Sequence, residues 1–284
     1  MVLYIHSMFL ESGYDIATMH TLQYVQTCIE KISRIAVPLF FAISGYLFFW
    51  NVTTIDEIRE KIKKRANTLL IPFVIGCLFT PLFFYIISNL PYISNLLKSS
   101  LISELSQMSI CELFYAIFIT PTNVPLWYIR DLMIIVVTTP LLYYIRRWGL
   151  WVCIVLFFCW IFLSTDLTPD DGMVMSHTIY KSYFWFMAGS FFIDKKYPLW
   201  VSLLLFTVYA TSCIMHEQAS CIFRSINGLY ELILTFGVLG FWNTLGAFIS
   251  DGFSIKQHKY LNYLSAASFF VYIYHFSTIG IVRK

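Results

Sequence analysis

The stretch Pro125-Leu-Trp-Tyr-Ile-Arg-Asp131 runs directly into the apolar segment Leu132–Leu142. An arginine and an aspartate therefore stand side by side where a segment suited to lipid begins. Ionised groups inside a bilayer are costly, so they are rare there and usually have a function. The stretch predicts a membrane-spanning helix whose first turn is charged.

On a helix, Trp127, Arg130 and Asp131 are spaced i, i+3 and i+4, so they share one face. Arg130 and Asp131 themselves are about 100° apart around the helix, and we expect them to pair poorly with each other. Each then needs a partner on another helix or in a water-filled cavity. Two uses remain open: a polar clamp between helices, or the wall of a substrate site.

The composition defines the class of protein. Of the 284 residues, 58% are hydrophobic and only 12% are charged, whereas soluble domains carry about 25% charged residues. This indicates an integral membrane protein. The small net charge of +3 suggests no nucleic-acid partner. The seven cysteines show no metal-ligand spacing, so we expect no metal site.

A membrane-spanning helix needs about 20 mostly apolar residues. Full spans are predicted at 33–50, 68–89, 127–145, 149–164, 179–193, 198–214, 227–249 and 264–282. Residues 110–120 form a shorter apolar piece, interfacial or re-entrant. Residues 1–10 are interpreted as the end of a helix whose first half is missing. The predicted fold is all-α: one polytopic transmembrane helix bundle over residues 1–284, with about eight full spans plus a partial first helix.

The basic residues test this layout. Alternate loops each carry at least two of them, as expected for loops on the cytoplasmic side of a plasma membrane. These residues are Arg59, Lys61, Lys63, Lys64, Arg65, Arg146, Arg147, Lys195, Lys196, Lys256 and Lys259. The tail Arg283-Lys284 falls on the other side and is the exception. The layout places Pro125–Asp131 at the outer end of its span.

Residues 56–65 read as a short basic amphipathic helix on the inner membrane face, because Ile55, Ile58 and Ile62 supply its apolar side. One interpretation is a topology determinant that also touches anionic lipid. The other is a docking site for a phosphorylated cytoplasmic ligand. From the charges alone we favour the first.

Further polar residues interrupt apolar segments. His6 lies beside Ser7, and a lone buried histidine is more often a packing residue than a catalyst. Ser44-Gly45-Tyr46 interrupts the second span, where small residues permit a close helix contact or a bend, and Ser44 and Tyr46 could line a cavity. Glu231 is a further candidate. The last predicted span carries a polar stripe that suits helix–helix hydrogen bonds as well as a site: Ser265, Ser268, Tyr272 and His275.

Five segments, taken in order, resemble the acyltransferase 3 family of bacterial membrane O-acyltransferases. The most specific is Val37–Phe49, which is similar to the family's second-helix signature. The others are Tyr4–Ser7, Lys64–Pro72, Pro125–Leu132 and, more weakly, Ser268–His275. They run in the family's order along nearly the whole chain.

The resemblance implies transfer of an acyl group, often acetyl, from acyl-CoA to a hydroxyl of a cell-surface carbohydrate or glycolipid, in the bacterial inner membrane. Acyl-CoA would be a co-substrate, with no bound cofactor. His6 would act as general base, and Lys64 and Arg65 would attract the CoA phosphates. The remaining candidates would bind substrate or form the site wall: Ser44, Tyr46, Trp127, Arg130, Asp131, Tyr272 and His275.

The chain departs from the family pattern at both ends. It begins after the position of a basic residue that precedes the family's histidine, and a span expected after His275 is missing. In the basic loop, Thr68 replaces a second arginine. Two alternatives therefore stay open: a polytopic transporter or exporter, and an inactive truncated relative. The acceptor glycan and the oligomeric state are not predicted.

Overall fold

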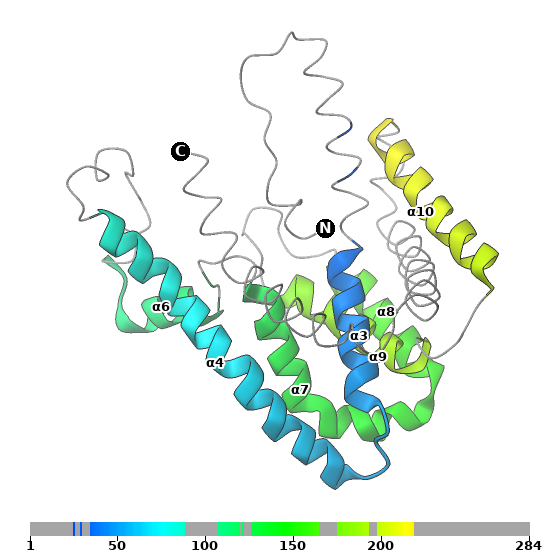
Figure 1. Cartoon of the computed structure of the whole chain (residues 1–284), viewed down its shortest axis with the longest axis horizontal. Coiled ribbons are helices and arrows are strands. Elements are labelled where there is room, and N and C mark those ends of the chain that lie inside the picture. The colour runs from blue at the N-terminus through cyan, green and yellow to red at the C-terminus, as the bar shows by residue number, and fades with distance from the viewer. Residues whose placement is uncertain are drawn as a thin grey trace, which may run out of the picture. The chain divides into compact units, whose positions relative to one another are not determined.

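The computed structural model describes residues 35–88, 107–119, 121, 126–164, 175–192 and 198–218, together with 25 and 29. Within these ranges every regular element is a helix (Figure 1). The α-helices are α3 (Ala36–Phe49), α4 (Ile55–Ser88), α6 (Ile110–Phe114), α7 (Trp127–Ile145), α8 (Leu150–Ser164), α9 (Met175–Phe192) and α10 (Leu199–Gln218). A π-helical turn, Tyr115–Ile119, continues α6.

The helix boundaries confirm most of the predicted layout in these ranges. Helix α7 covers 127–145, as predicted, and α3, α8, α9 and α10 lie within a few residues of their predicted spans. The predictions at 1–10, 227–249 and 264–282 lie outside the described residues. Helices α4 and α7 are the two, among the residues described, that have the length and composition to cross a membrane.

The described residues fall into two compact units, each built from segments far apart in the sequence. One unit contains α3, α8, α10 and residues 180–192 of α9. The other contains α4, α6, the π-helical turn and α7. The functional candidates are divided between the two units.

Helix α4 corrects one prediction. The short amphipathic helix at 56–65 and the span at 68–89 are one continuous helix of 34 residues, with Pro72 and Pro81 inside it. Residues 68–88 alone extend about 31 Å, which matches the hydrocarbon core of a bilayer. The charged start is therefore part of the same helix as the span. Its register relative to the apolar part is set by the helix.

Helices α4 and α7 pack side by side (Figure 1). The Tyr143 hydroxyl, near the end of α7, donates a 2.6 Å hydrogen bond to the carbonyl oxygen of Thr53, just before α4 begins. The start of α4 therefore lies beside the end of α7, and the two helices are antiparallel. The charged start of α4 and the charged start of α7 consequently lie at opposite ends of this pair.

Helices α3 and α9 meet in the other unit without intervening side chains. A Cβ added at Gly45 would overlap the backbone carbonyl of Phe186, and one added at Gly189 would overlap the backbone carbonyl of Ala42. Small residues permit such backbone contact between helices in a membrane. The predicted role of Ser44-Gly45 as a close helix contact is confirmed for Gly45.

An aromatic cluster joins α8 to α9 in the same unit. The Trp160 ring lies 5.5 Å from that of Phe184 and 6.4 Å from that of Trp185. The ammonium group of Lys181 lies 5.1 Å from the centre of the Trp160 ring. Such a cation–π contact favours keeping a lysine next to an aromatic ring in an apolar setting.

Candidate functional site

Helix α4 begins with a capping box. The Glu57 backbone N–H donates to the Thr54 hydroxyl at 3.4 Å, while the Glu57 carboxylate accepts from the backbone N–H groups of Thr53 and Thr54 at 2.7 and 3.3 Å. These backbone hydrogen bonds lower the pKa of Glu57 from its ordinary value. The box satisfies N–H groups that a helix start would otherwise leave without partners.

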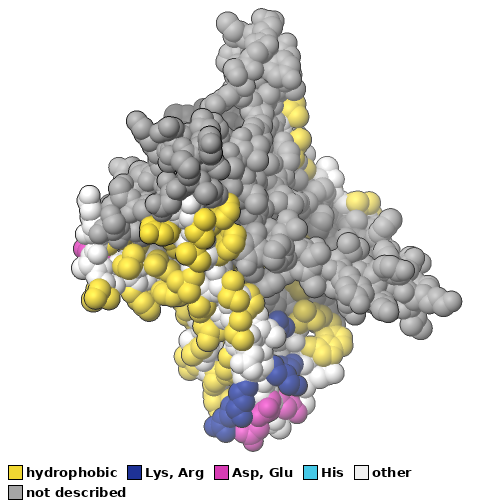
Figure 2. Space-filling view, turned by 60° about the vertical axis from the view of Figure 1, so that its left-hand side comes forward, with side chains coloured by type: hydrophobic (Ala, Val, Ile, Leu, Met, Phe, Trp, Pro, Cys, Tyr) yellow, Lys and Arg dark blue, Asp and Glu magenta, His cyan; other side chains and the backbone are white. Residues whose placement is uncertain are grey.

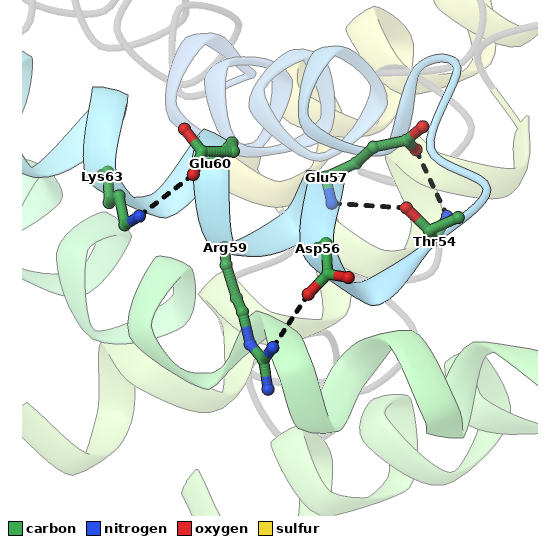
Figure 3. Close-up of polar contacts among 6 residues, drawn as sticks. All are labelled: Thr54, Asp56, Glu57, Arg59, Glu60 and Lys63. Atoms are coloured by element: carbon green, nitrogen blue, oxygen red, sulfur yellow. Dashed lines mark hydrogen bonds and ion pairs between the residues drawn. The ribbon is translucent and has the colours of Figure 1, made fainter.

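The other two acidic residues of this segment each neutralise one basic neighbour. Arg59 pairs with Asp56 at 2.8 Å, and Lys63 pairs with Glu60 at 3.0 Å (Figure 3). Both ion pairs are largely exposed, so each stabilises the helix by only about 0–1 kcal/mol. Their main consequence is that these cations are already partnered.

Lys64 and Arg65 are basic residues of the same segment that these acidic residues do not neutralise. Neither side chain forms an ion pair or a hydrogen bond with any residue that the structure describes. Partial burial lowers the pKa of Lys61, and Arg65 and Lys64 nearby lower it further against the opposing effect of Glu57. An anion placed here would relieve this repulsion. An open hollow of about 870 Å³ runs along this part of α4, from Thr54 to Lys64.

The space-filling view shows that charged and apolar side chains occupy separate areas of the surface. In Figure 2 the charged side chains gather at one end of the visible described surface, beside a larger area of hydrophobic side chains. The charged end corresponds to the first three turns of α4. This is the pattern of a membrane helix with a basic end.

The ion pair at the start of α7 corrects a second prediction. Arg130 and Asp131 were expected to pair poorly, yet Nη2 and Nε of Arg130 donate to Oδ1 of Asp131 at 2.7 and 2.9 Å. The side chains are 5% and 0% exposed. The long arginine side chain folds back across the 100° separation, because burying either charge alone would cost far more than this bend.

Arg130 also reaches a second element, as predicted. Its Nη1 donates to the carbonyl oxygen of Ile119, the last residue of the π-helical turn. The guanidinium thus ties the turn before α7 to the first turn of α7. Both charges are enclosed by protein groups, which is the arrangement that a polar clamp requires.

The other candidates are distributed as follows. Trp127 is half-buried and begins α7. Ser44 and Tyr46 are half-buried on either side of Gly45 in α3, within the other unit. His6, Tyr272 and His275 lie outside the described residues. In the described ranges, no group of His, Cys, Asp and Glu side chains gathers to hold a metal ion.

Three features were missed from the sequence. Gly189 carried the same signal as Gly45, a small residue in an apolar helix, and could have been found. The Ile119 carbonyl carries no sequence signal, because every residue has one. Nor does sequence show that the indole N–H of Trp185 is buried without a hydrogen-bond partner among the described residues, since burial depends on the packing of α8 and α9.

The comparisons with known proteins agree with the resemblance. A protein-family model described as an acyltransferase domain matches residues 1–284. The succinoglycan biosynthesis protein ExoH of Rhizobium meliloti (strain 1021) is 32% identical over 117 residues. That match covers 40% of this chain and 30% of the relative. No solved structure matches. Because the family model matches the whole chain, the protein belongs to the acyltransferase 3 family.

Proposed function

We propose that the protein is a multi-pass inner-membrane enzyme that transfers an acyl group, acetyl first among the candidates, from acyl-CoA to a hydroxyl of a cell-surface carbohydrate. The observation that carries the proposal is the match to the acyltransferase model over residues 1–284. The relative named for succinoglycan biosynthesis supports a polysaccharide as the acceptor class. The high apolar content and the helices α4 and α7 support the membrane location.

The proposed reaction needs one base and no metal. His6 removes the proton of the acceptor hydroxyl, and the oxygen attacks the carbonyl carbon of the thioester. The carbon–sulfur bond breaks, the acyl group forms an ester with the acceptor, and the CoA thiolate takes up a proton. A histidine suits this role because its ordinary pKa lies near neutrality.

The two ends of the α4–α7 pair fit the two substrates. The donor is cytoplasmic and carries phosphates, so it belongs at the basic start of α4, where Arg65 can offer a fork of N–H donors. The acceptor approaches from the other face, where α7 begins. In this proposal the Arg130–Asp131 clamp shapes the wall on the acceptor side by holding the π-helical turn against α7.

The test is acyl transfer by the purified full chain in liposomes. Radiolabelled acetyl-CoA and other acyl-CoA donors are supplied with cell-envelope glycans, and label in the glycan is measured. The wild type is compared with His6→Ala and with a matched control, His258→Ala, at a histidine between the predicted spans 227–249 and 264–282. We expect transfer by the wild type and the control, and at least a 100-fold loss in His6→Ala.

The possible failures have different meanings. Transfer that survives His6→Ala contradicts the role of this histidine but leaves the reaction intact. Folded protein that binds no CoA favours the transporter or the inactive relative. CoA binding without transfer to any glycan would contradict the carbohydrate acceptor.

A further inference from the structure

One face of α4 carries an uninterrupted stripe of exposed apolar side chains. These side chains are 46% to 58% exposed. The stripe consists of Ile71, Ile75, Leu78, Leu82, Tyr85 and Ile86. The opposite face is buried and includes Leu69, Phe73, Cys77 and Thr80. An exposed apolar stripe on a helix of this length is the surface that lipid chains cover.

Lys64 continues this stripe into the charged end of the helix. Seven residues make nearly two full turns, so Lys64, Ile71, Leu78 and Tyr85 lie in one line. All four are exposed. Since α4 is one continuous helix from Ile55 to Ser88, no loop separates the lysine from the apolar stripe.

Arg65 lies in a different row of residues along α4. The residues at the same spacing from it are Ile58, Pro72 and Phe79, of which Ile58 is fully buried and the others are half-buried. Arg65 is itself half-buried. The adjacent cations Lys64 and Arg65, which the family resemblance grouped into one phosphate site, therefore leave the helix about 100° apart.

The position of Lys64 along the bilayer normal indicates which lipid groups lie beside it. It lies six residues, or about 9 Å, before Leu70, which is the first exposed large apolar side chain of α4. The headgroup layer of a bilayer is about 5–8 Å thick on each side, and a lysine side chain can reach several ångströms along the helix. Lys64 therefore carries a positive charge, unpaired with any described residue, at the level of lipid phosphates.

We propose that Lys64 binds the phosphate of an anionic phospholipid in the cytoplasmic leaflet, with the acyl chains of that lipid along the Ile71–Leu78–Tyr85 line. The site thus divides the two cations: Lys64 serves the lipid, and Arg65 serves the donor. This inference rests on the part of the proposed function that places α4 across a membrane. It does not depend on acyl transfer.

The test uses the full chain in neutral detergent, titrated with phosphatidylglycerol and, separately, with phosphatidylcholine, while native mass spectrometry counts bound lipids. We expect phosphatidylglycerol to bind in preference, and Lys64→Gln to weaken it about fivefold, since one basic residue near an anionic surface contributes about 1 kcal/mol. Lys63→Gln is the matched control. It removes the same charge one residue away, but that charge is already paired with Glu60, so we expect less than a twofold change.

A competition arm separates lipid phosphate from CoA phosphate. Saturating CoA should leave phosphatidylglycerol bound to the wild type. Displacement by CoA, or equal weakening in Lys64→Gln and Lys63→Gln, overturns the proposal. If the chain binds no CoA yet Lys64→Gln still loses phosphatidylglycerol, the donor part of the proposed function fails and the lipid site stands.

Discussion

The α4–α7 pair carries charges at both ends, and the two ends use them in opposite ways. At the start of α7, Arg130 and Asp131 are buried and bonded to each other and to a backbone carbonyl. At the start of α4, Lys64 and Arg65 reach the surface without an ion pair to any described residue. One end holds the protein together, whereas the other is open to an anionic ligand.

The difference teaches that charge near a membrane helix does not by itself mark a substrate site. Buried charges must be neutralised by protein groups, and once neutralised they have little left to offer a ligand. Exposed charges at a helix end cost little and can remain unpaired. Mutations at the two ends should therefore separate loss of fold from loss of ligand binding.

The largest effect is expected at the buried end. Asp131→Ala should lower the free energy of unfolding by about 3–5 kcal/mol, because it leaves the Arg130 charge buried without its carboxylate. Thermal unfolding in detergent, followed by circular dichroism, measures this loss. The double variant Arg130→Met/Asp131→Leu is the control and should be much milder. An Asp131→Ala protein with wild-type stability would show that the pair does not hold the helices.

The glycine contact between α3 and α9 provides a comparison that involves no charge. Gly45→Ala should destabilise the protein by about 1–3 kcal/mol, because the added Cβ overlaps the Phe186 backbone and the helices must separate. The same unfolding measurement applies. Leu47→Ala, at a half-exposed position of α3, is the control and should cost less. Equal losses in both variants would contradict the close contact.

A smaller effect is expected at the start of α4, where Lys64 and Arg65 lie. It should appear in CoA binding and not in stability. Arg65→Gln should weaken CoA binding about tenfold, the effect of one charge-assisted hydrogen bond of about 1.5 kcal/mol. The melting temperature should stay within error, since Arg65 has no described partner to lose. Calorimetry with CoA measures the first quantity. Destabilisation without a change in CoA affinity would mean that Arg65 has a structural role.

The smallest effect concerns the capping box of α4. The pKa of Glu57 is lowered, so its contribution to the helix start is complete above the ordinary value of 4.5 and is lost as the pH falls through the lower folded value. Glu57→Gln keeps an acceptor but removes this titration. Hydrogen exchange at the amides of Thr53 and Thr54 should therefore become faster at low pH in the wild type, relative to this variant. Identical pH profiles would remove Glu57 from the box.

The sequence alone predicted much of the fold and little of the site's geometry. Helix α7 was predicted at its observed ends, because long apolar runs bounded by charged residues leave few alternatives. The donor candidates Lys64 and Arg65 were named from the family resemblance, since the charges alone favoured a topology determinant. The pairing of Arg130 with Asp131 could not, since helical spacing describes where side chains leave the backbone and not how a long one bends.

Local patterns thus determined the class of protein, the helices and the family, since these depend on composition, periodicity and ordered motifs that the chain carries in itself. Tertiary structure decided which charges are enclosed and which are open. It brought the Ile119 carbonyl to Arg130, set Gly45 against the backbone of α9, and placed Lys64 and Arg65 on different faces relative to the core. The physical reason is that burial depends on the packed molecule: a cation surrounded by protein must be neutralised by protein groups, whereas an exposed cation remains accessible from outside the protein.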